Sequence, residues 1–268
     1  MKVFDINIHL PCKGKNLGEH LPEDLNMEAD DLIGCFDYYK DDFLRMSGGN
    51  FMLFNEKIDY KEVLLFTQYV KRKMAKPFFT LLVDFRSSTD DHLERMQQSG
   101  IDAIKFHSYV QRISEEDFEQ VLLYARKAEK LNLPIFIDTS YGTTKMYQYD
   151  NLKLSAYLLD HIKDTPVVLL HTGCSRVMDA FLLAASCDNV FLDGSFNINT
   201  YLGSSVEKDI AFCYKKIGFD RVVYGSDSPY ISCEESLHSV KTFFLNNGIN
   251  QNQQEKMLST SWRGVFGA

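Results

Sequence analysis

The sequence lacks the close cysteine pairs that build zinc knuckles and redox motifs. Its six cysteines stand apart, at positions 12, 35, 174, 187, 213 and 233, and this spacing predicts reduced thiols. No stretch approaches the roughly 20 consecutive apolar residues that cross a bilayer, so no membrane association is expected. The N-terminal segment reaches Asp5 too early for the apolar region of a signal peptide. Together these absences predict a cytoplasmic protein.

The sequence also has fewer basic residues than acidic ones. The chain has 29 lysines and arginines against 37 aspartates and glutamates, a formal net charge of -8, and nucleic acid is therefore not an expected partner. No glycine-rich turn follows the first apolar run, which argues against a doubly wound dinucleotide-binding sheet. The sequence contains no linker, internal repeat or low-complexity segment, so one domain over residues 1–268 is expected.

What the sequence does contain is a repeated theme of apolar run, polar turn and amphipathic stretch. Eight apolar runs cover residues 3–9, 51–54, 77–85, 103–107, 134–138, 166–171, 190–193 and 222–224. Apolar spacing predicts helices over 58–74, 114–131, 152–162, 176–186, 206–217 and 234–246, and a closing helix over 251–266. Because parallel strands need crossover helices, this alternation indicates an α/β protein whose sheet closes into a (β/α)8 TIM barrel.

The longest piece outside this alternation follows the first run. Residues 10–25 are rich in glycine, proline and polar residues, and residues 27–46 are expected to be helical. We therefore expect an extended loop-helix insertion after strand 1. A long loop on the catalytic face of a barrel usually shapes the mouth of the site.

Polar side chains end at least five of the predicted strands, where a barrel builds its active site. The first strand offers Asp5, Asn7 and His9, which strand alternation places on one face. The later strand ends supply Lys105 and His107, then Asp138, then His171, then Asp193 and Ser195, and finally Asp227. A single strand histidine is more often a hydrogen-bonded core residue. So many ionisable groups at one end of a barrel would be costly to bury unpaired, so a functional site is the better interpretation.

These segments resemble the signatures of the amidohydrolase-related (amidohydrolase 2) family, barrel enzymes of the amidohydrolase superfamily. The matching segments are Asp5-Ile6-Asn7-Ile8-His9, Ile104-Lys105-Phe106-His107, His171-Thr172-Gly173, residues 189–193 and residues 224–229, in this order along the chain. The resemblance implies that His9, His171 and Asp227 hold one divalent metal, commonly zinc, with Asp227 as the base that activates water and His171 as a ligand or oxyanion stabiliser. Lys105 and His107 would bind a substrate carboxylate or carbonyl. Tyr141 and Ser195 are further candidates for the substrate pocket.

Two positions depart from the family pattern. Asn7 stands where the first histidine of a His-x-His pair belongs, and Asp138 stands where the strand-five histidine is expected. A metal held by Asn7, His9, Asp138, His171 and Asp227 would find a harder, more oxygen-rich site, which suits manganese, magnesium or iron better than zinc.

A metal-free site is the alternative to one divalent ion such as zinc or manganese. The superfamily includes lactonases that work without a metal, and here Asp227 could serve as base with Lys105, His107 and His171 as electrophiles. The thiols of Cys12 and Cys174 lie close to these strand ends in sequence and are a weaker option as ligand or nucleophile.

The sequence therefore predicts a hydrolase that cleaves a lactone, ester or amide bond in a small anionic substrate, with water activated by Asp227 with or without a metal. A metal-dependent decarboxylase of the same family is a second hypothesis. A binding protein with a decayed active site is a third, because two expected histidines are lost. The loops after residues 10, 107, 141, 195 and 230 would set the substrate, and a homodimer is expected by analogy with similar barrels.

Overall fold

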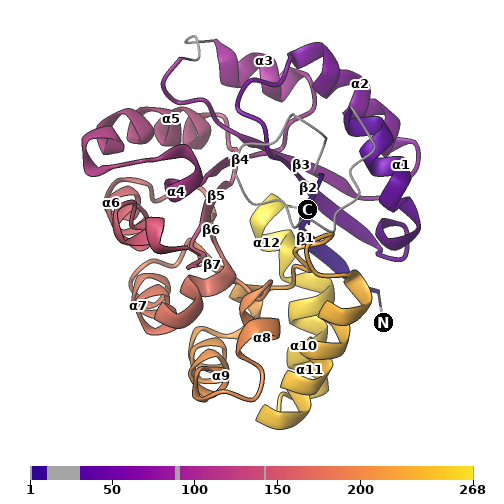
Figure 1. Ribbon diagram of the computed structural model, residues 1–268, viewed down its shortest axis with the longest axis vertical. Coiled ribbons are helices and arrows are strands. Elements are labelled where there is room, and N and C mark those ends of the chain that lie inside the picture. The colour runs from indigo at the N-terminus through magenta and orange to yellow at the C-terminus, as the bar shows by residue number, and fades with distance from the viewer. Residues whose placement is uncertain (1, 11–30, 88–90, 142, 268) are drawn as a thin grey trace.

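Eight strands form one parallel sheet in the computed structural model, which describes residues 2–10, 31–87, 91–141 and 143–267 (Figure 1). The strands are β1 (Phe4–His9), β2 (Gly48–Leu53), β3 (Pro77–Leu82), β4 (Ala103–Phe106), β5 (Ile135–Asp138), β6 (Val167–Leu170), β7 (Val190–Asp193) and β8 (Val222–Val223). Each strand pairs with the next one in sequence. Backbone hydrogen bonds from Ile6 to Tyr224 (2.9 Å) and from His9 to Ser228 (2.7 Å) join the first strand to the last. The predicted (β/α)8 barrel is confirmed.

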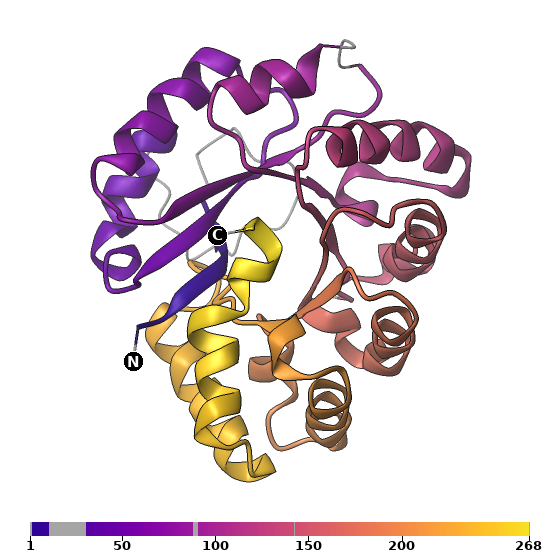
Figure 2. The same ribbon diagram turned by 180° about the vertical axis from the view of Figure 1, so that it is seen from behind.

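Helices surround the barrel in both views (Figures 1 and 2). They are α1 (Leu32–Phe43), α2 (Tyr60–Lys71), α3 (His92–Gln98), α4 (Ser108–Gln111), α5 (Phe118–Lys130), α6 (Asn151–His161), α7 (Val177–Ser186), α8 (Asn197–Tyr201), α9 (Ser205–Ile217), α10 (Cys233–Asn247), α11 (Gln251–Glu255) and α12 (Trp262–Phe266). The six helices predicted between the strands correspond to α2, α5, α6, α7, α9 and α10. The short helices α3, α4 and α8 were not predicted, because four to seven residues carry too little periodicity to detect.

The second strand starts earlier than its apolar run predicts. β2 begins at Gly48 rather than at Phe51, and the first glycine is needed for space. A Cβ atom on Gly48 would lie 2.7 Å from the Lys76 backbone oxygen, whereas one on Gly49 would first meet the flexible end of the Ile8 side chain, at 2.5 Å. Hydrophobic patterning does not register such positions, since the requirement is close approach of two backbones.

The insertion after β1 is described only in part. α1 begins at Leu32, where Asp31 caps it by accepting a hydrogen bond from the Gly34 N–H at 2.7 Å. Part of the helix predicted over 27–46 is thus confirmed. The loop, with Cys12 and the start of the predicted helix, lies within residues 11–30 and so outside the described residues.

The interior of the barrel is apolar at the amino ends of the strands. The residues that fill it are Phe4, Ile6, Met52, Ala103, Phe136, Val168, Leu170, Phe191 and Val223, packed against Trp262 and Val265. Trp262 stacks on Phe4 with ring centroids 4.3 Å apart. Figure 2 shows α12 lying across this end of the barrel. The closing helix predicted over 251–266 is confirmed, with a π-helical segment (Lys256–Thr260) between α11 and α12.

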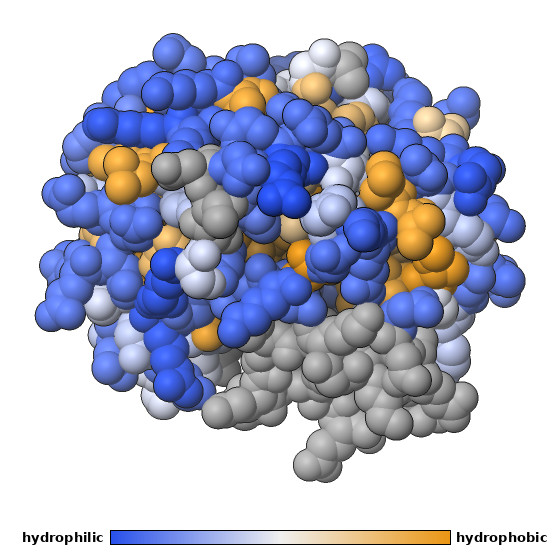
Figure 3. Space-filling view, turned by 90° about the horizontal axis from the view of Figure 1, so that it is seen from above, coloured by the Kyte–Doolittle hydropathy of each residue, from blue (hydrophilic) through white to orange (hydrophobic). Residues whose placement is uncertain are grey.

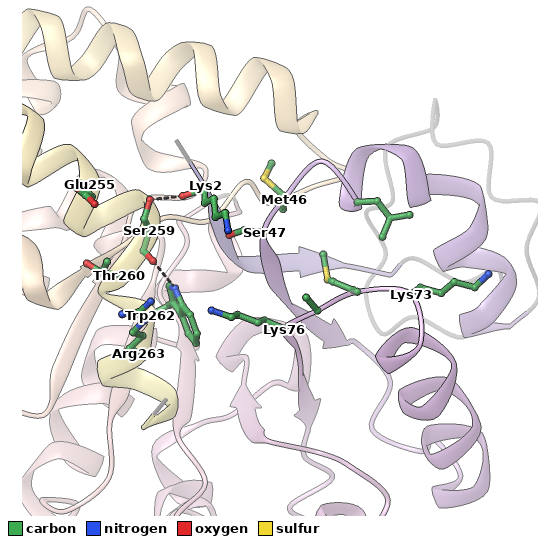
Figure 4. Close-up of a pocket in the computed structure, with 13 residues that line it drawn as sticks. Lys2, Met46, Ser47, Lys73, Lys76, Glu255, Ser259, Thr260, Trp262 and Arg263 are labelled. Carbon is green, nitrogen blue, oxygen red and sulfur yellow. Dashed lines mark hydrogen bonds between the residues drawn. The ribbon is translucent and has the colours of Figure 1, made fainter.

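A surface groove of about 590 Å³ lies at this same amino end (Figure 4). Its lining includes Lys2, Ser47 and Lys76, which precede the first three strands, together with Trp262 and Arg263. The groove is therefore separate from the strand ends that carry the predicted site. Over the face shown in Figure 3, hydrophobic residues form separate patches among hydrophilic ones. Among the helices of the described ranges, none is long and apolar enough to span a bilayer.

Candidate functional site

The candidate side chains gather at the carboxyl end of the barrel, where they are buried. Relative exposure is 0% for Asn7, 1% for Lys105, 2% for Asp138, 4% for His171, 5% for His107, 6% for His9 and 7% for Asp227. The strands place them there because successive inward positions of β4, β5 and β8 lead from apolar residues to polar ones. Six ionisable groups are costly to bury together unless they pair with one another, so their contacts determine what the site can do.

Asp138 is the centre of the first group. Its Oδ2 atom lies 3.3 Å from Lys105 Nζ, 3.3 Å from His107 Nε2 and 3.3 Å from His171 Nε2. Its Oδ1 atom accepts hydrogen bonds from the Ser140 N–H at 3.0 Å and from the Ser140 hydroxyl at 2.5 Å. Both carboxylate oxygens are therefore occupied by donors from the protein.

The protonation states of this group differ sharply between its two histidines. Burial lowers the pKa of His107 to about 3, so this imidazole is neutral. Burial also opposes protonation of His171, but the charges of Asp138 and Asp227 raise its pKa to about 9. Burial opposes ionisation of Asp138, yet His107, Lys105 and His171 hold its pKa well below the ordinary value. At neutral pH the group contains one carboxylate and two cations, Lys105 and His171.

Asp227 is the centre of the second group. Its Oδ1 atom lies 3.3 Å from His9 Nε2 and accepts a hydrogen bond from Asn7 Nδ2 at 3.0 Å. Burial opposes ionisation, but His171 and His9 lower the pKa of this carboxyl below its ordinary value. Burial and the charge of Lys105 lower the pKa of His9. Asp227 is thus an ionised carboxylate beside a neutral imidazole.

Ser195 joins the two groups. Its hydroxyl lies 3.0 Å from Asn7 Nδ2 and 3.1 Å from His171 Nδ1, and it donates a short hydrogen bond to Asp193 Oδ2. Asp193 also accepts the backbone N–H groups of His171 at 3.1 Å and of Ser195 at 3.0 Å. The pair Asp193 and Ser195, which the sequence marks only weakly, therefore connects His171 on one side with Asn7 on the other.

Asp5 has a different position from Asn7 and His9. The register between β1 and β2 shifts between Asp5 and Ile8, which marks an irregularity in β1. The Oδ1 atom of Asp5 accepts the backbone N–H groups of Asn7 at 3.1 Å and of Ser226 at 2.9 Å. Simple alternation predicts one shared face for the three residues. Instead, Asp5 ties the backbone of β1 to the segment that carries Asp227.

Strained backbone follows three of the strands. Of the non-glycine residues described with positive φ, five belong to these turns: His171, Thr172, Cys174, Phe196 and Asp227. Such conformations cost of order 1–2 kcal/mol each for ordinary residues, and strain of this kind clusters at functional sites. The turn after β6 is held by hydrogen bonds from Thr172 Oγ1 to the Asp193 carbonyl (2.6 Å) and from the Gly173 N–H to Thr139 Oγ1 (2.8 Å).

Aromatic rings border the site, and sequence reasoning missed the most central one. The Phe54 ring lies 5.6 Å from the ring of His9 and 5.5 Å from that of His107, and Lys105 Nζ stands 5.2 Å from its centroid. Tyr230 contacts His9 at 5.2 Å. Phe54 comes directly after β2, but an apolar residue at a strand end gives no signal that separates it from core.

Two predicted site residues have other surroundings. The hydroxyl of Tyr141 donates to Asp150 at 2.8 Å and accepts from Arg176 at 2.5 Å, so these partners occupy the group expected to bind substrate. Cys174 is fully buried, and burial raises the pKa of its thiol to about 12. A thiol in that state is neither a good nucleophile nor a ready metal ligand.

Comparison of the sequence with protein-family models matches the amidohydrolase model over residues 54–260. The chain belongs to the amidohydrolase family. The match covers most of the barrel, including Lys105, His107, Asp138, His171 and Asp227. No curated protein matches the sequence.

Solved structures with the same fold cover the full length of the chain. A probable 2-pyrone-4,6-dicarboxylic acid hydrolase from Acinetobacter baumannii, with citric acid bound, is 15% identical, with a TM-score of 0.70 and 100% of both chains covered. An amidohydrolase from Burkholderia multivorans with bound zinc is 11% identical, with a TM-score of 0.67 and coverage of 100% and 99%. The 2,6-dihydroxybenzoate decarboxylase from Rhizobium is 13% identical, with a TM-score of 0.61 and coverage of 100% and 99%. At these identities the likeness concerns the fold.

The donor set of this chain does not fit the metal ion that the family implies. Within the described ranges, no group of three or more His, Cys, Asp and Glu side chains is arranged to hold an ion. The Asp138 oxygen that would bind a metal already faces Lys105 and two imidazoles. Asn7 turns its nitrogen, rather than its oxygen, towards Asp227. Two carboxylates and two cations balance, and a divalent ion beside the Lys105 ammonium would upset that balance.

Proposed function

We propose that this protein hydrolyses a small anionic substrate with a lactone, ester or amide carbonyl, and that Asp227 is the general base that activates water. One arrangement supports the proposal: the ionised Asp227 shares a buried space with the cations Lys105 and His171. Hydrolysis of a carbonyl needs both, because the water must lose a proton while the carbonyl oxygen gains negative charge.

In the proposed reaction, Asp227 takes a proton from water, and the water oxygen bonds to the carbonyl carbon. The π electrons of the carbonyl move onto its oxygen, where Lys105 and protonated His171 stabilise the charge. When the tetrahedral intermediate collapses, the bond from carbon to the leaving oxygen or nitrogen breaks. The leaving group takes the proton from Asp227, which returns to its ionised state. The neutral His9 beside Asp227 orients the carboxylate throughout.

The cations also favour a substrate that carries a carboxylate of its own. Among the described residues, Lys105 Nζ is buried without a hydrogen-bond partner apart from its ion pair with Asp138, so donor directions stay open towards them. His107 presents a neutral ring beside it. The structural neighbour that holds citric acid is described as a hydrolase of a dicarboxylate. This supports testing 2-pyrone-4,6-dicarboxylate first and then other lactones that carry carboxylates.

The test is turnover of this panel, followed by ultraviolet absorbance or by the acid released. If a substrate is found, we expect Asp227→Asn to lower kcat by at least roughly 1,000-fold, in line with the loss of a general base that also orients water. Asp164→Asn, which changes an exposed carboxylate, is the matched control and should keep full activity. Turnover that survives Asp227→Asn would refute the proposed role of this residue.

Decarboxylation is a second candidate, since a decarboxylase of 2,6-dihydroxybenzoate shares the fold. There, protonated His171 would give its proton to the carbanion that carbon dioxide leaves behind, and no water would be activated. Incubation with dihydroxybenzoates and unsaturated acids, with detection of carbon dioxide, separates the two reactions. Carbon dioxide without a hydrolysis product favours the decarboxylase.

A further inference from the structure

The amide nitrogen of Asn7 has two hydrogen-bond partners inside the barrel. Nδ2 lies 3.0 Å from Asp227 Oδ1 and 3.0 Å from Ser195 Oγ. These partners follow β8 and β7, so the contacts join segments separated by 220 and 188 residues. Asn7 and Ser195 are fully buried, and Asp227 is 7% exposed. Because these side chains are buried, each bond holds its partner more firmly than an exposed bond would.

The partners determine which way the Asn7 amide faces. Asp227 Oδ1 accepts from Asn7, and so does Ser195 Oγ, whose own proton goes to Asp193, so the amide group that faces both oxygens is the nitrogen. The opposite orientation would bring Oδ1 to 3.0 Å from a carboxylate oxygen with no proton between them. In the observed orientation, Oδ1 is buried and has no hydrogen-bond partner within the part of the chain that the structure describes. Asn7 therefore acts on Asp227 as a donor and does not share a ligand position with it.

Ser195 and Asp193 hold Asn7 in this orientation. The two oxygens of Asp193 accept backbone N–H groups, and Oδ2 also receives the Ser195 hydroxyl proton. A hydroxyl has one proton, so the remaining lone pairs of Ser195 Oγ accept from Asn7 Nδ2 and His171 Nδ1. Ser195 thus supports both the donor that faces Asp227 and the imidazole that faces Asp138.

The segment just after β8 packs so closely against these side chains that a glycine is needed there. A Cβ atom on Gly225 would lie 2.7 Å from Asp193 Oδ1, 2.8 Å from Asn7 Cβ and 3.1 Å from Ser195 Cβ. These three neighbours are the members of the hydrogen-bonded chain that ends at Asp227. Close packing around Gly225 therefore leaves Asn7 little room to turn away from Asp227.

We propose that Asn7 is a positioning residue for Asp227: anchored by Ser195 and Asp193, its amide nitrogen holds the Asp227 carboxylate in the single orientation from which it can take a proton from water. A neutral donor here does the orienting work that a metal ion bound to both residues could otherwise do. The kinetic consequences rest on the proposed function, whereas the structural consequences do not.

The kinetic test compares Asn7→Ala and Asn7→Asp with the matched variant Asn50→Ala. Asn50 is also a fully buried barrel asparagine, but it bonds the Ile6 carbonyl and Thr80. With the substrate found in the panel, we expect both Asn7 variants to lower kcat about 100-fold, as small misplacements of a reacting group do, and KM to stay within about threefold, the pattern of an interaction made in the transition state. Asn7→Ala removes the donor, whereas Asn7→Asp places a second carboxyl beside Asp227 that would share a proton with it. Asn50→Ala should keep kcat, and an Asn7→Ala variant that also keeps kcat would overturn the inference.

Two further measurements decide the matter even if no substrate is turned over. In crystal structures of the wild type and Asn7→Ala, we expect the Asp227 carboxylate to change rotamer or split into two conformers. An unchanged, fully ordered Asp227 would overturn the inference while leaving the proposed reaction open. Because the donor set does not fit a metal ion, we expect neither the wild type nor Asn7→Ala to retain zinc in titrations of the chelator-treated protein. Zinc that binds the wild type, and binds Asn7→Ala at least roughly tenfold more weakly, would make Asn7 a ligand and would also overturn the inference.

Discussion

His171 Nε2 lies 3.3 Å from Asp138 Oδ2, and this ion pair joins the ends of β6 and β5 inside the barrel. Burial alone would lower the pKa of His171, yet Asp138 and Asp227 raise it to about 9. Burial alone would raise the pKa of Asp138, yet the surrounding imidazoles and Lys105 hold it well below the ordinary value. The pair is therefore ionised at neutral pH and contributes to stability, and His171 is one of the two cations of the proposed reaction.

The raised pKa of His171 predicts how stability depends on pH. Protonated His171 contributes stability fully below its unfolded-state pKa of 6.5, and the contribution disappears as pH rises through about 9. We expect His171→Gln to lower Tm by at least roughly 5 °C at pH 6. The difference from the wild type should shrink by pH 10. Thermal melts at the two pH values check this, and a difference independent of pH would contradict it.

Removal of the Asp138 charge should destabilise the barrel strongly. In Asp138→Asn, the buried Lys105 ammonium loses its only described ion-pair partner, and such a break costs about 3–5 kcal/mol. Urea denaturation measures the loss. The double variant Asp138→Asn with Lys105→Met removes the stranded cation and should recover part of the free energy of unfolding. No recovery in the double variant would mean that the charge is not the cause.

Asp5 predicts a pH dependence of the same sign as that of His171, but in a lower pH range. Burial raises its pKa to about 7, against the hydrogen bonds from Ser226 and Asn7 that lower it. Since the folded state keeps the proton more tightly, ionised Asp5 costs stability progressively as pH rises from about 3.8 to about 7. Asp5→Asn should therefore raise Tm at pH 8, by up to roughly 5 °C, and have little effect at pH 4.5. Equal effects at both pH values would count against this account.

Gly225→Ala should destabilise the protein by steric overlap alone. Its new methyl group would meet Asp193 and Asn7 at less than 3 Å, and overpacking of this kind costs about 1–3 kcal/mol. Gly203→Ala is the comparison, because nothing lies within 4 Å there and only its positive φ opposes a side chain. We expect Gly225→Ala to be the less stable of the two in urea and to lose activity. Equal losses would show that the close approach is tolerated.

Chelation should not remove the function. The donors around Asp138 and Asp227 already pair with one another, so we expect dialysis against a strong chelator to leave Tm and turnover within experimental error. Mass-spectrometric metal analysis before and after dialysis confirms that any ion has gone. Loss of turnover that returns on addition of zinc or manganese would restore the metal-dependent mechanism.

The strands and their polar ends could be predicted from sequence because each depends on local pattern. Apolar runs ending in Lys105, Asp138 and Asp227 are visible in a single strand, and parallel pairing brings their ends together. The start of β2 could not be predicted, because Gly48 is required by the backbone of a neighbouring strand. The π-helical segment inside the closing helix could not be predicted either, because hydrophobic periodicity does not separate it from an ordinary α-helix.

The hydrogen-bond and ion-pair partners of the candidate residues were harder to predict from the sequence than the candidate residues themselves. Asn7 looks like a lost ligand in sequence, and only the distances to Ser195 and Asp227 make it a donor. Tyr141 follows a strand like the other candidate residues, yet its hydroxyl bonds Asp150 and Arg176. Asn7 meets Ser195 and Asp227, which lie 188 and 220 residues further along the chain, only because the barrel closes. A short stretch of sequence does not contain that information.

The contact between Asn7 and Asp227 requires the first and last strands to be in place together. During synthesis, β1 leaves the ribosome early but has no neighbour on one edge until β8 and the turn after it emerge. The single tryptophan reports the same event, because Trp262 on α12 stacks on Phe4 at the start of β1. The fluorescence of Trp262 can therefore be used to follow closure of the barrel in time. The proposed activity should appear only once the change in fluorescence is complete.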